Sequence, residues 1–153
     1  MPHMTADLPD TNVWVALATD RHRHHQVAVE WFDSLADNAS ARFCRMTQNS
    51  FLRLMTVVEF QKEDTLSNVE AMGVHDRLRG DPRVGWSDES PGVEDRWFRL
   101  ASLSTPSPKR WMDAYLAAFA LAGDLRLVTF DSGFRQFRRE GLEVLVLGHS
   151  AKA

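Results

Sequence analysis

The chain has 153 residues, a formal net charge of −3 at pH 7 and ordinary fractions of hydrophobic (44%) and charged (25%) residues, which is typical of one soluble globular domain. The negative net charge argues against a protein that holds nucleic acid by overall charge alone, and the lone cysteine, Cys44, excludes an intrachain disulfide. No apolar run approaches the ~20 residues of a membrane span, and no signal-peptide core begins the chain. We therefore expect a cytoplasmic protein with no membrane partner, with one domain over residues 4–150 and a cloning remnant at residues 1–3.

Short apolar runs alternate with helical patterns along the chain. The runs predict five strands, at Ala6–Pro9, Ala41–Cys44, Arg83–Trp86, Leu125–Phe130 and Leu142–Leu147. Apolar residues at three- and four-residue spacing predict helices, at Asn12–Ala18, Gln26–Ala36, Thr47–Val58, Ser67–Leu78, Val93–Leu103 and Arg110–Gly123. Phe60–Leu66 is expected to be a charged connection. This alternation is typical of an α/β protein whose mostly parallel sheet is covered on both faces.

Several residues predict helix boundaries and helix faces. Thr47 is a suitable N-cap, and Gly123 is expected to end its helix because glycine tolerates a left-handed backbone. In the helix Ser67–Leu78, the spacing predicts that Val69 and Met72 face the core. Four tryptophans fall on apolar stripes and are expected in the core or at an interface: Trp14, Trp31, Trp97 and Trp111.

Three aspartates occupy strand ends or a helix start, positions that a parallel sheet can bring to one edge. Asp10 and Asp131 each follow a predicted strand, and Asp113 lies in the first turn of a predicted helix. Ligands of open parallel sheets bind outside the carboxyl ends of strands, so these acids can share one edge. Clustered carboxylates usually need a cation, and oxygen-only ligands favour Mg²⁺ or Mn²⁺ over zinc. Taken singly, each aspartate is also explained as a helix-start or turn residue.

Four segments resemble motifs of a known family. L-P-D-T-N-V at 8–13, D-A-Y-L-A-A at 113–118 and T-F-D-S-G-F at 129–134 resemble, in order, the motifs of PIN domains, and T-Q-N-S-F-L-R at 47–53 resembles a segment of VapC toxins. The resemblance implies a three-layer α/β/α sandwich with a mostly parallel central sheet of about five strands. It also implies a Mg²⁺- or Mn²⁺-dependent endoribonuclease that cuts tRNA or rRNA, forms a homodimer and is held inactive by a VapB-type antitoxin.

The resemblance also assigns roles to residues. It implies that Asp10, Asp113 and Asp131 are the catalytic, metal-binding acids, with Thr11 or Asn12 supporting the site through hydrogen bonds. An ion held there would assist phosphodiester hydrolysis by activating water, so that no side-chain nucleophile is required.

One position departs from the family pattern. Most PIN domains carry a further acid, commonly glutamate, in the helix after the second strand, where this chain has Gln48, Asn49 and Ser50. Gln48 could hold a metal-bound water but brings no charge, and Glu59 lies about three turns further along. One well-held ion is therefore expected.

Basic and aromatic residues near these motifs are candidates for contacts with RNA or with a protein partner. Arg53, Arg135 and Arg138 are candidate RNA contacts, although the last two also fit a solvated face. Trp14 and Val15 are expected on a dimer or antitoxin surface.

Three histidines, His22, His24 and His25, do not have the spacing of a zinc site. They are expected to be polar residues at a helix start, near the RNA path.

Two other functions compete with the nuclease. A catalytically weak PIN-like module that binds RNA or a protein partner would fit Gln48 and the negative net charge. A phosphatase of the haloacid dehalogenase type is suggested by D-T-N-V at 10–13, although Asn12 replaces the second aspartate of that family's motif.

Overall fold

The central sheet contains five strands, all of them parallel. The computed structural model describes residues 5–148, so the predicted remnant at 1–3 and the two ends of the predicted domain, at residue 4 and at 149–150, lie outside the described residues. The strands are β1 (Asp7–Pro9), β2 (Ala41–Phe43), β3 (Val84–Trp86), β4 (Arg126–Thr129) and β5 (Val144–Val146). Their order is β3-β2-β1-β4-β5, which confirms the predicted α/β fold.

Seven α-helices and two 3-10 helices connect the strands within residues 5–148. The α-helices are α1 (Thr11–Ala18), α2 (His25–Asp33), α3 (Arg45–Met55), α4 (Val58–Gln61), α5 (Asn68–Arg79), α6 (Val93–Ala101) and α7 (Pro108–Gly123), and the 3-10 helices are η1 (Lys62–Asp64) and η2 (Ser132–Glu140). The predicted charged connection at Phe60–Leu66 therefore holds the end of α4 and all of η1. In the described part of the chain, no helix is long and apolar enough to cross a membrane.

The helices cover both faces of the sheet and enclose two apolar cores. On one face, α1, α2, α3 and α5 pack on the sheet, and the rings of Trp14 and Phe43 stack with centroids 3.9 Å apart. On the other face, α6, α7 and η2 pack on Leu8 and Leu127. Successive strand residues such as Leu127 and Val128 belong to different cores, because side chains of a strand alternate between faces. The three-layer sandwich is confirmed.

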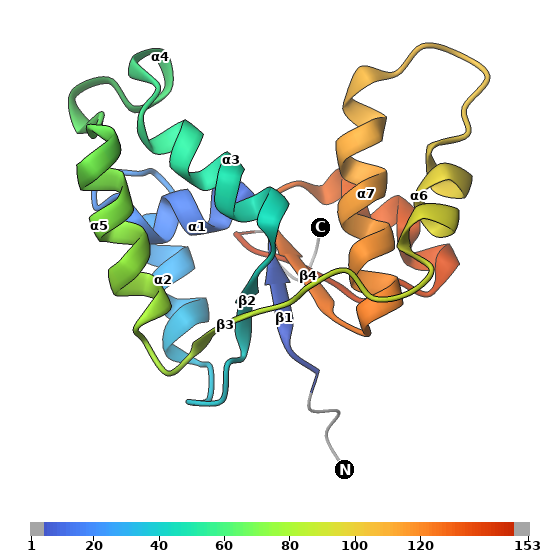
Figure 1. The fold of residues 1–153 in the computed structure, drawn as a ribbon, viewed down its shortest axis with the longest axis horizontal. Helices are drawn as coiled ribbons and strands as arrows, with labels where there is room; N and C mark the ends of the chain where they lie inside the picture. The colour runs from blue at the N-terminus through green and yellow to red at the C-terminus, as the bar shows by residue number, and fades with distance from the viewer. Residues whose placement is uncertain (1–4, 149–153) are drawn as a thin grey trace.

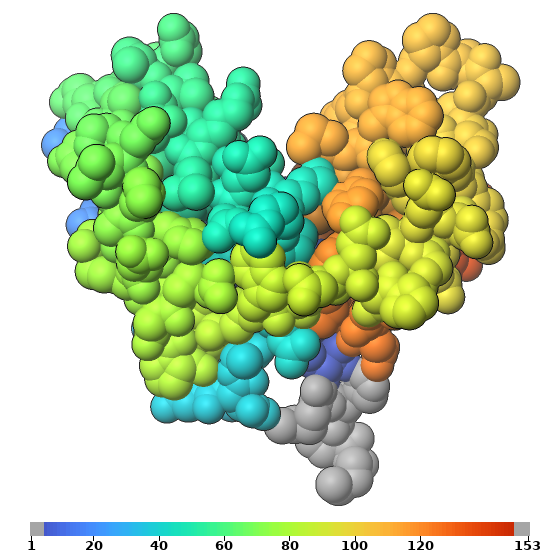
Figure 2. Space-filling model, in the orientation of Figure 1, coloured from blue at the N-terminus to red at the C-terminus, as the bar shows by residue number. Residues whose placement is uncertain are grey.

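The two groups of helices form two arms above the sheet (Figure 1). The arm with α3 and α5 and the arm with α6 and α7 diverge, and the space-filling view shows the notch between them (Figure 2). A cleft of about 660 Å³ lies there, lined by residues of α3, of α7 and of the β3–α6 connection, among them Arg45, Gln48, Glu89, Met112 and Tyr115.

Packing overturns two predictions about apolar faces. Trp14 and Val15 are fully buried, so the prediction that they form a dimer or antitoxin surface is wrong. Val69 and Met72 were expected in the core but are 78% and 57% exposed.

Two helix starts and one C-terminal cap differ from the prediction. Cys44, not Thr47, is the N-cap of α3, and Thr47 lies at the third helical position, where its Oγ1 accepts a hydrogen bond from the Cys44 N–H (3.0 Å). Helix α7 ends at Gly123, as predicted, but the left-handed residue is the Asp124 that follows it (φ 53°). Because α7 begins at Pro108, Asp113 lies in its second turn.

Candidate active site

Asp10 links the end of β1 to the start of α1. It is the N-cap of α1, and its Oδ1 accepts a hydrogen bond from the Thr11 N–H (2.7 Å). Its Oδ2 accepts one from the Thr129 hydroxyl (3.1 Å) on the neighbouring strand β4. Burial raises the pKa of Asp10, and the charges of Asp113 and Asp131 raise it further, whereas the two hydrogen bonds lower it. The carboxylate is thus anchored, desolvated and within the field of both other acids.

Asp131 follows β4 and begins η2. Its Oδ1 accepts a hydrogen bond from the Gly133 N–H (2.8 Å), and its own N–H donates to Thr129 Oγ1 (3.0 Å). A Cβ at Gly133 would lie 3.0 Å from Asp131 Oδ1, so glycine leaves room for this turn. The bonds from Lys109 and Gly133 lower the pKa of Asp131, which keeps it ionised.

Asp113 reaches the same place from α7 and is joined to Asp131 by a lysine. Lys109 Nζ lies 3.3 Å from Asp113 Oδ2 and 2.8 Å from Asp131 Oδ2. Burial raises the pKa of Asp113, and the Lys109 charge opposes that shift. The Lys109 side chain is itself 71% exposed, so it lies on the solvent side of the two acids that it bridges.

The three predicted acids are therefore brought to one edge, and their ligand chemistry fits a hard cation. All their donor atoms are carboxylate oxygens, the ligands that Mg²⁺ and Mn²⁺ prefer, and an ammonium group already bridges two of them. Within residues 5–148, no three His, Cys, Asp or Glu side chains lie close enough together to hold one metal ion in this conformation.

Thr11 and Asn12 differ in their contribution. The Thr11 backbone holds Asp10, and its side chain is buried. Asn12 is exposed on α1.

Gln48 is held by two residues that the sequence did not connect to it. Its Oε1 accepts a hydrogen bond from Arg45 Nη1 (2.5 Å), and its Nε2 lies 3.3 Å from His75 Nε2. His75 comes from α5 and packs against the Phe43 ring. Both ends of the Gln48 amide are thus engaged with α3 and α5.

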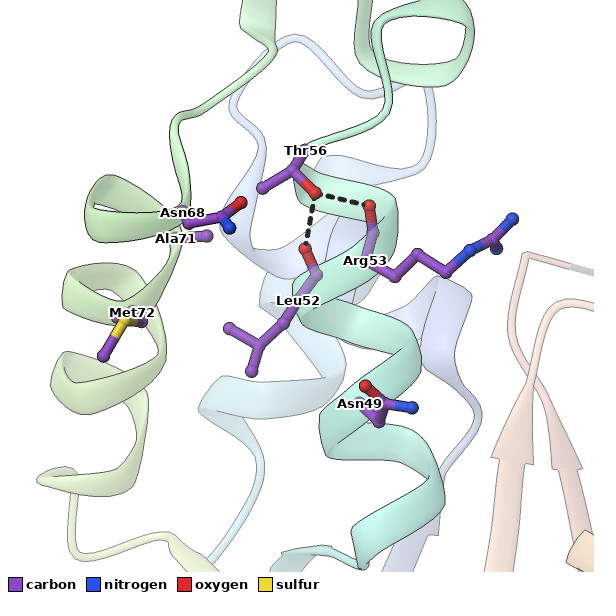
Figure 3. Close-up of a pocket in the computed structure, with 7 residues that line it drawn as sticks. All are labelled: Asn49, Leu52, Arg53, Thr56, Asn68, Ala71 and Met72. Atoms are coloured by element: carbon purple, nitrogen blue, oxygen red, sulfur yellow. Dashed lines mark hydrogen bonds between the residues drawn. The ribbon is translucent and has the colours of Figure 1, made fainter.

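The three predicted RNA contacts lie in different settings. Arg53 is exposed in the last turn of α3 and lines a pocket of about 310 Å³ between α3 and α5, which Leu52 and Met72 also line (Figure 3). Arg138 donates from Nη2 to the Val144 carbonyl (3.3 Å), and the Nε of Arg135 is buried without a hydrogen-bond partner.

The three histidines lie just before and at the start of α2. His24 stacks on Phe130, which follows β4, with ring centroids 4.6 Å apart, and His25 Nδ1 lies 2.8 Å from the Ala16 carbonyl oxygen. Burial lowers the pKa of His22.

Two residues that contact the acids were not predicted from the sequence. Lys109 precedes Asp113 by four residues, a spacing that places both on one helical face, so the signal was available. Thr129 lies inside the 129–134 motif, but its bonds to Asp10 and Asp131 depend on the pairing of β1 with β4, which the sequence pattern does not specify.

The chain is similar to known proteins over most of its length. The family model for the PIN domain matches residues 8–140. Ribonuclease VapC41 of Mycobacterium tuberculosis is 41% identical over 144 residues, which are 92% of this chain and 97% of that protein. Ribonuclease VapC44 of the same organism is 31% identical over 81% of this chain and 84% of its own length.

Solved structures share the fold at low sequence identity. VapBC2 from Rickettsia felis, bound to a DNA fragment from its promoter, matches with a TM-score of 0.66 and 15% identity over 93% of this chain and 98% of that chain. Mycobacterium tuberculosis VapC20, a toxin that cleaves the sarcin–ricin loop, matches with a TM-score of 0.60 and 16% identity over 86% and 94%. The family match and the relatives agree over nearly the whole chain, which therefore belongs to the PIN-domain family, within its VapC ribonuclease branch.

Proposed function

We propose that this chain is a Mg²⁺- or Mn²⁺-dependent endoribonuclease, the toxin of a toxin–antitoxin pair, and that Asp10, Asp113 and Asp131 bind the metal. The observation that carries the proposal is the meeting of these acids at the carboxyl edge of the sheet, where an ammonium group bridges two of them. The similarity to ribonucleases VapC41 and VapC44 supports the activity.

The side chains have separate tasks in this proposal. An ion held by the three acids would act as a Lewis acid on the phosphoryl group and make water a better nucleophile. Thr129 keeps Asp10 oriented and ties the Asp131 backbone to β4. Lys109 balances the charge of Asp113 and Asp131, and it has to leave them when a metal takes its place.

Partners follow from the same relatives. An antitoxin of the VapB type is the proposed partner, because the structures that match include the toxin–antitoxin complex VapBC2. We propose tRNA or rRNA as the substrate, and a homodimer as the assembly.

The decisive experiment compares cleavage by the wild type and by Asp113→Asn in Mg²⁺, in Mn²⁺ and in EDTA, on total tRNA and ribosomal RNA. We expect discrete fragments only from the wild type and only with metal. The loss should exceed ~100-fold, because 10–100-fold is typical for residues that only support a metal ligand. Asp10→Asn and Asp131→Asn should behave in the same way.

Asp95→Asn is the matched control, since Asp95 is an exposed carboxylate in the first turn of α6, and it should cut like the wild type. Undiminished cleavage by all three site variants would contradict the assignment of the acids. RNA binding without cleavage at any Mn²⁺ concentration would favour the binding-module alternative.

A further inference from the structure

We propose that Arg45 and Arg79, both held against Trp86, form a phosphate-binding clamp for a single-stranded RNA substrate, one or two nucleotides away from the acids. This inference rests on the proposed function, because it identifies how the same site holds its substrate. We call these three residues the arginine clamp.

An aromatic ring positions both guanidinium groups. The Cζ atoms of Arg45 and Arg79 each lie 4.8 Å from the centroid of the Trp86 ring, within the range of a cation–π contact. The ring is itself fixed, because Trp86 Nε1 donates a hydrogen bond to Asp88 Oδ1 (2.8 Å). Arg45 also donates to Gln48 Oε1. The two charges are therefore positioned before any ligand binds.

Neither guanidinium group of the clamp has a direct carboxylate partner within residues 5–148, although the Asp88 carboxylate accepts a hydrogen bond from the ring that both share. Over residues 5–148, neither Arg45 nor Arg79 forms an ion pair with a carboxylate, whereas Arg21, Arg83 and Arg126 each do. Two cations that share one ring repel each other. An anion that binds both would remove this repulsion, and guanidinium groups match the oxygens of a phosphate.

The sheet register places Trp86 and Arg45 beside the acids, and Arg79 reaches Trp86 from the end of α5. Trp86, the last residue of β3, pairs with Phe43, the last residue of β2, and Arg45 begins α3 directly beyond that strand. Asp10 lies beyond β1, the next strand. Two strand spacings of ~4.8 Å put the end of β3 about 10 Å from the end of β1, on the same edge of the sheet.

The chemistry of the clamp and its place favour the RNA backbone as the ligand. Arg45 also lines the 660 Å³ cleft that opens above this edge (Figure 2). A single-stranded RNA whose scissile phosphate lies at the acids would bring a neighbouring phosphate group to the clamp. Contacts of this kind fix register without reading sequence, and a local pair of charges explains how a chain with a net charge of −3 can hold an anionic substrate.

The test measures binding without cleavage. Fluorescence anisotropy of a labelled single-stranded RNA is recorded in EDTA at several salt concentrations, with Asp113→Asn as the parent. We expect Arg45→Gln and Arg79→Gln each to weaken binding by roughly 3–10-fold and to reduce the slope of log affinity against log salt by about 0.7 per lost contact. In the otherwise wild-type enzyme with metal, each change should raise KM more than it lowers kcat.

Arg21→Gln is the control, because it removes one positive charge from an exposed side chain paired with Glu63; it should leave affinity and slope unchanged. Equal effects of all three substitutions would overturn the clamp, since net charge alone would then explain them. A hexaglutamate peptide that binds more tightly than the RNA, through the same arginines, would also overturn the proposal. The arginines would then be a binding site for an acidic protein segment. Clamp-dependent RNA binding by a chain that never cuts would support the clamp and contradict the proposed nuclease.

Discussion

Lys109 is the residue whose position has the clearest consequence for metal binding. Its ammonium group lies within 3.3 Å of Asp113 and 2.8 Å of Asp131, so a metal ion that uses both carboxylates has to displace it. The side chain is 71% exposed, and exposed ion pairs contribute at most about 1 kcal/mol each. We therefore expect the lysine to weaken metal binding without preventing it.

We expect Lys109→Gln to bind Mn²⁺ several-fold more tightly than the wild type, because the competing cation is gone. Calorimetric titration with Mn²⁺ in the absence of RNA measures this directly. Lys62→Gln removes the same charge from η1 and serves as the control, with little expected change. Identical Mn²⁺ affinities for Lys109→Gln and Lys62→Gln would show that Lys109 does not compete.

At the residue scale, the sequence predicted the positions of the acids that directly follow a strand. Asp10 and Asp131 were expected at one edge because each follows an apolar strand pattern, and both lie there. The contact of Gln48 with His75 was not predictable, because it joins residues 27 positions apart and depends on how α3 packs on α5.

At the scale of elements, strand and helix types were predictable, whereas helix faces were less so. All five predicted strands are present, because each short apolar run lies between helical patterns and is buried in a covered parallel sheet. In α5, the buried residues are Ala71 and His75, not the larger Val69 and Met72. Ala71 belongs to the core on this face of the sheet, and a count of apolar residues does not detect which face of α5 is turned inward.

We expect His75 to make the stability of α5 depend on pH. Its pKa is lowered mainly by burial, and the Arg79 charge lowers it further, whereas Asp76 opposes the shift. A histidine with a lowered folded-state pKa is protonated first in the unfolded chain. Its contribution to the free energy of unfolding is therefore intact above about pH 6.5 and is lost as the pH falls from there toward the folded-state pKa.

We accordingly expect the wild type to lose more stability than His75→Gln between pH 7 and pH 5, measured by urea unfolding at each pH. Glutamine can keep a hydrogen bond to Gln48 but does not titrate. Parallel losses in both proteins would mean that His75 is not the titrating group, in which case His22, whose pKa is also lowered by burial, would be the next residue to replace.

At the scale of the whole molecule, the pair β1–β4 joins the two arms and is fastened at both ends. At the carboxyl end, Thr129 bonds to Asp10 in the site. At the other end, Asp7, only 2% exposed, accepts hydrogen bonds from Arg126 Nε (2.8 Å) and Nη2 (2.9 Å) and from Trp31 Nε1 (2.9 Å). One end of the pair serves the site, and the other holds the sheet to α2.

We expect Asp7→Ala to lower the free energy of unfolding by about 2–3 kcal/mol. Removing one partner of a fully buried ion pair costs about 3–5 kcal/mol, and the Arg126 side chain, which is 31% exposed, keeps part of its hydration. Asp33→Ala breaks the surface pair with Arg83, whose carboxylate partner is 67% exposed, and should cost less than about 1 kcal/mol. Guanidinium unfolding of both variants provides the comparison.

Cleavage by Asp7→Ala should persist well below its unfolding midpoint, because the acids lie at the opposite end of the same strands and keep their own bonds to Thr129 and Gly133. A variant that is destabilised but active would place the Asp7–Arg126 pair in the framework. Asp7→Ala could instead lose cleavage at a temperature where it is fully folded. That result would mean that the amino-terminal end of β1 and β4 controls the spacing of Asp10 and Asp131. The two ends of the strand pair would then act as one unit.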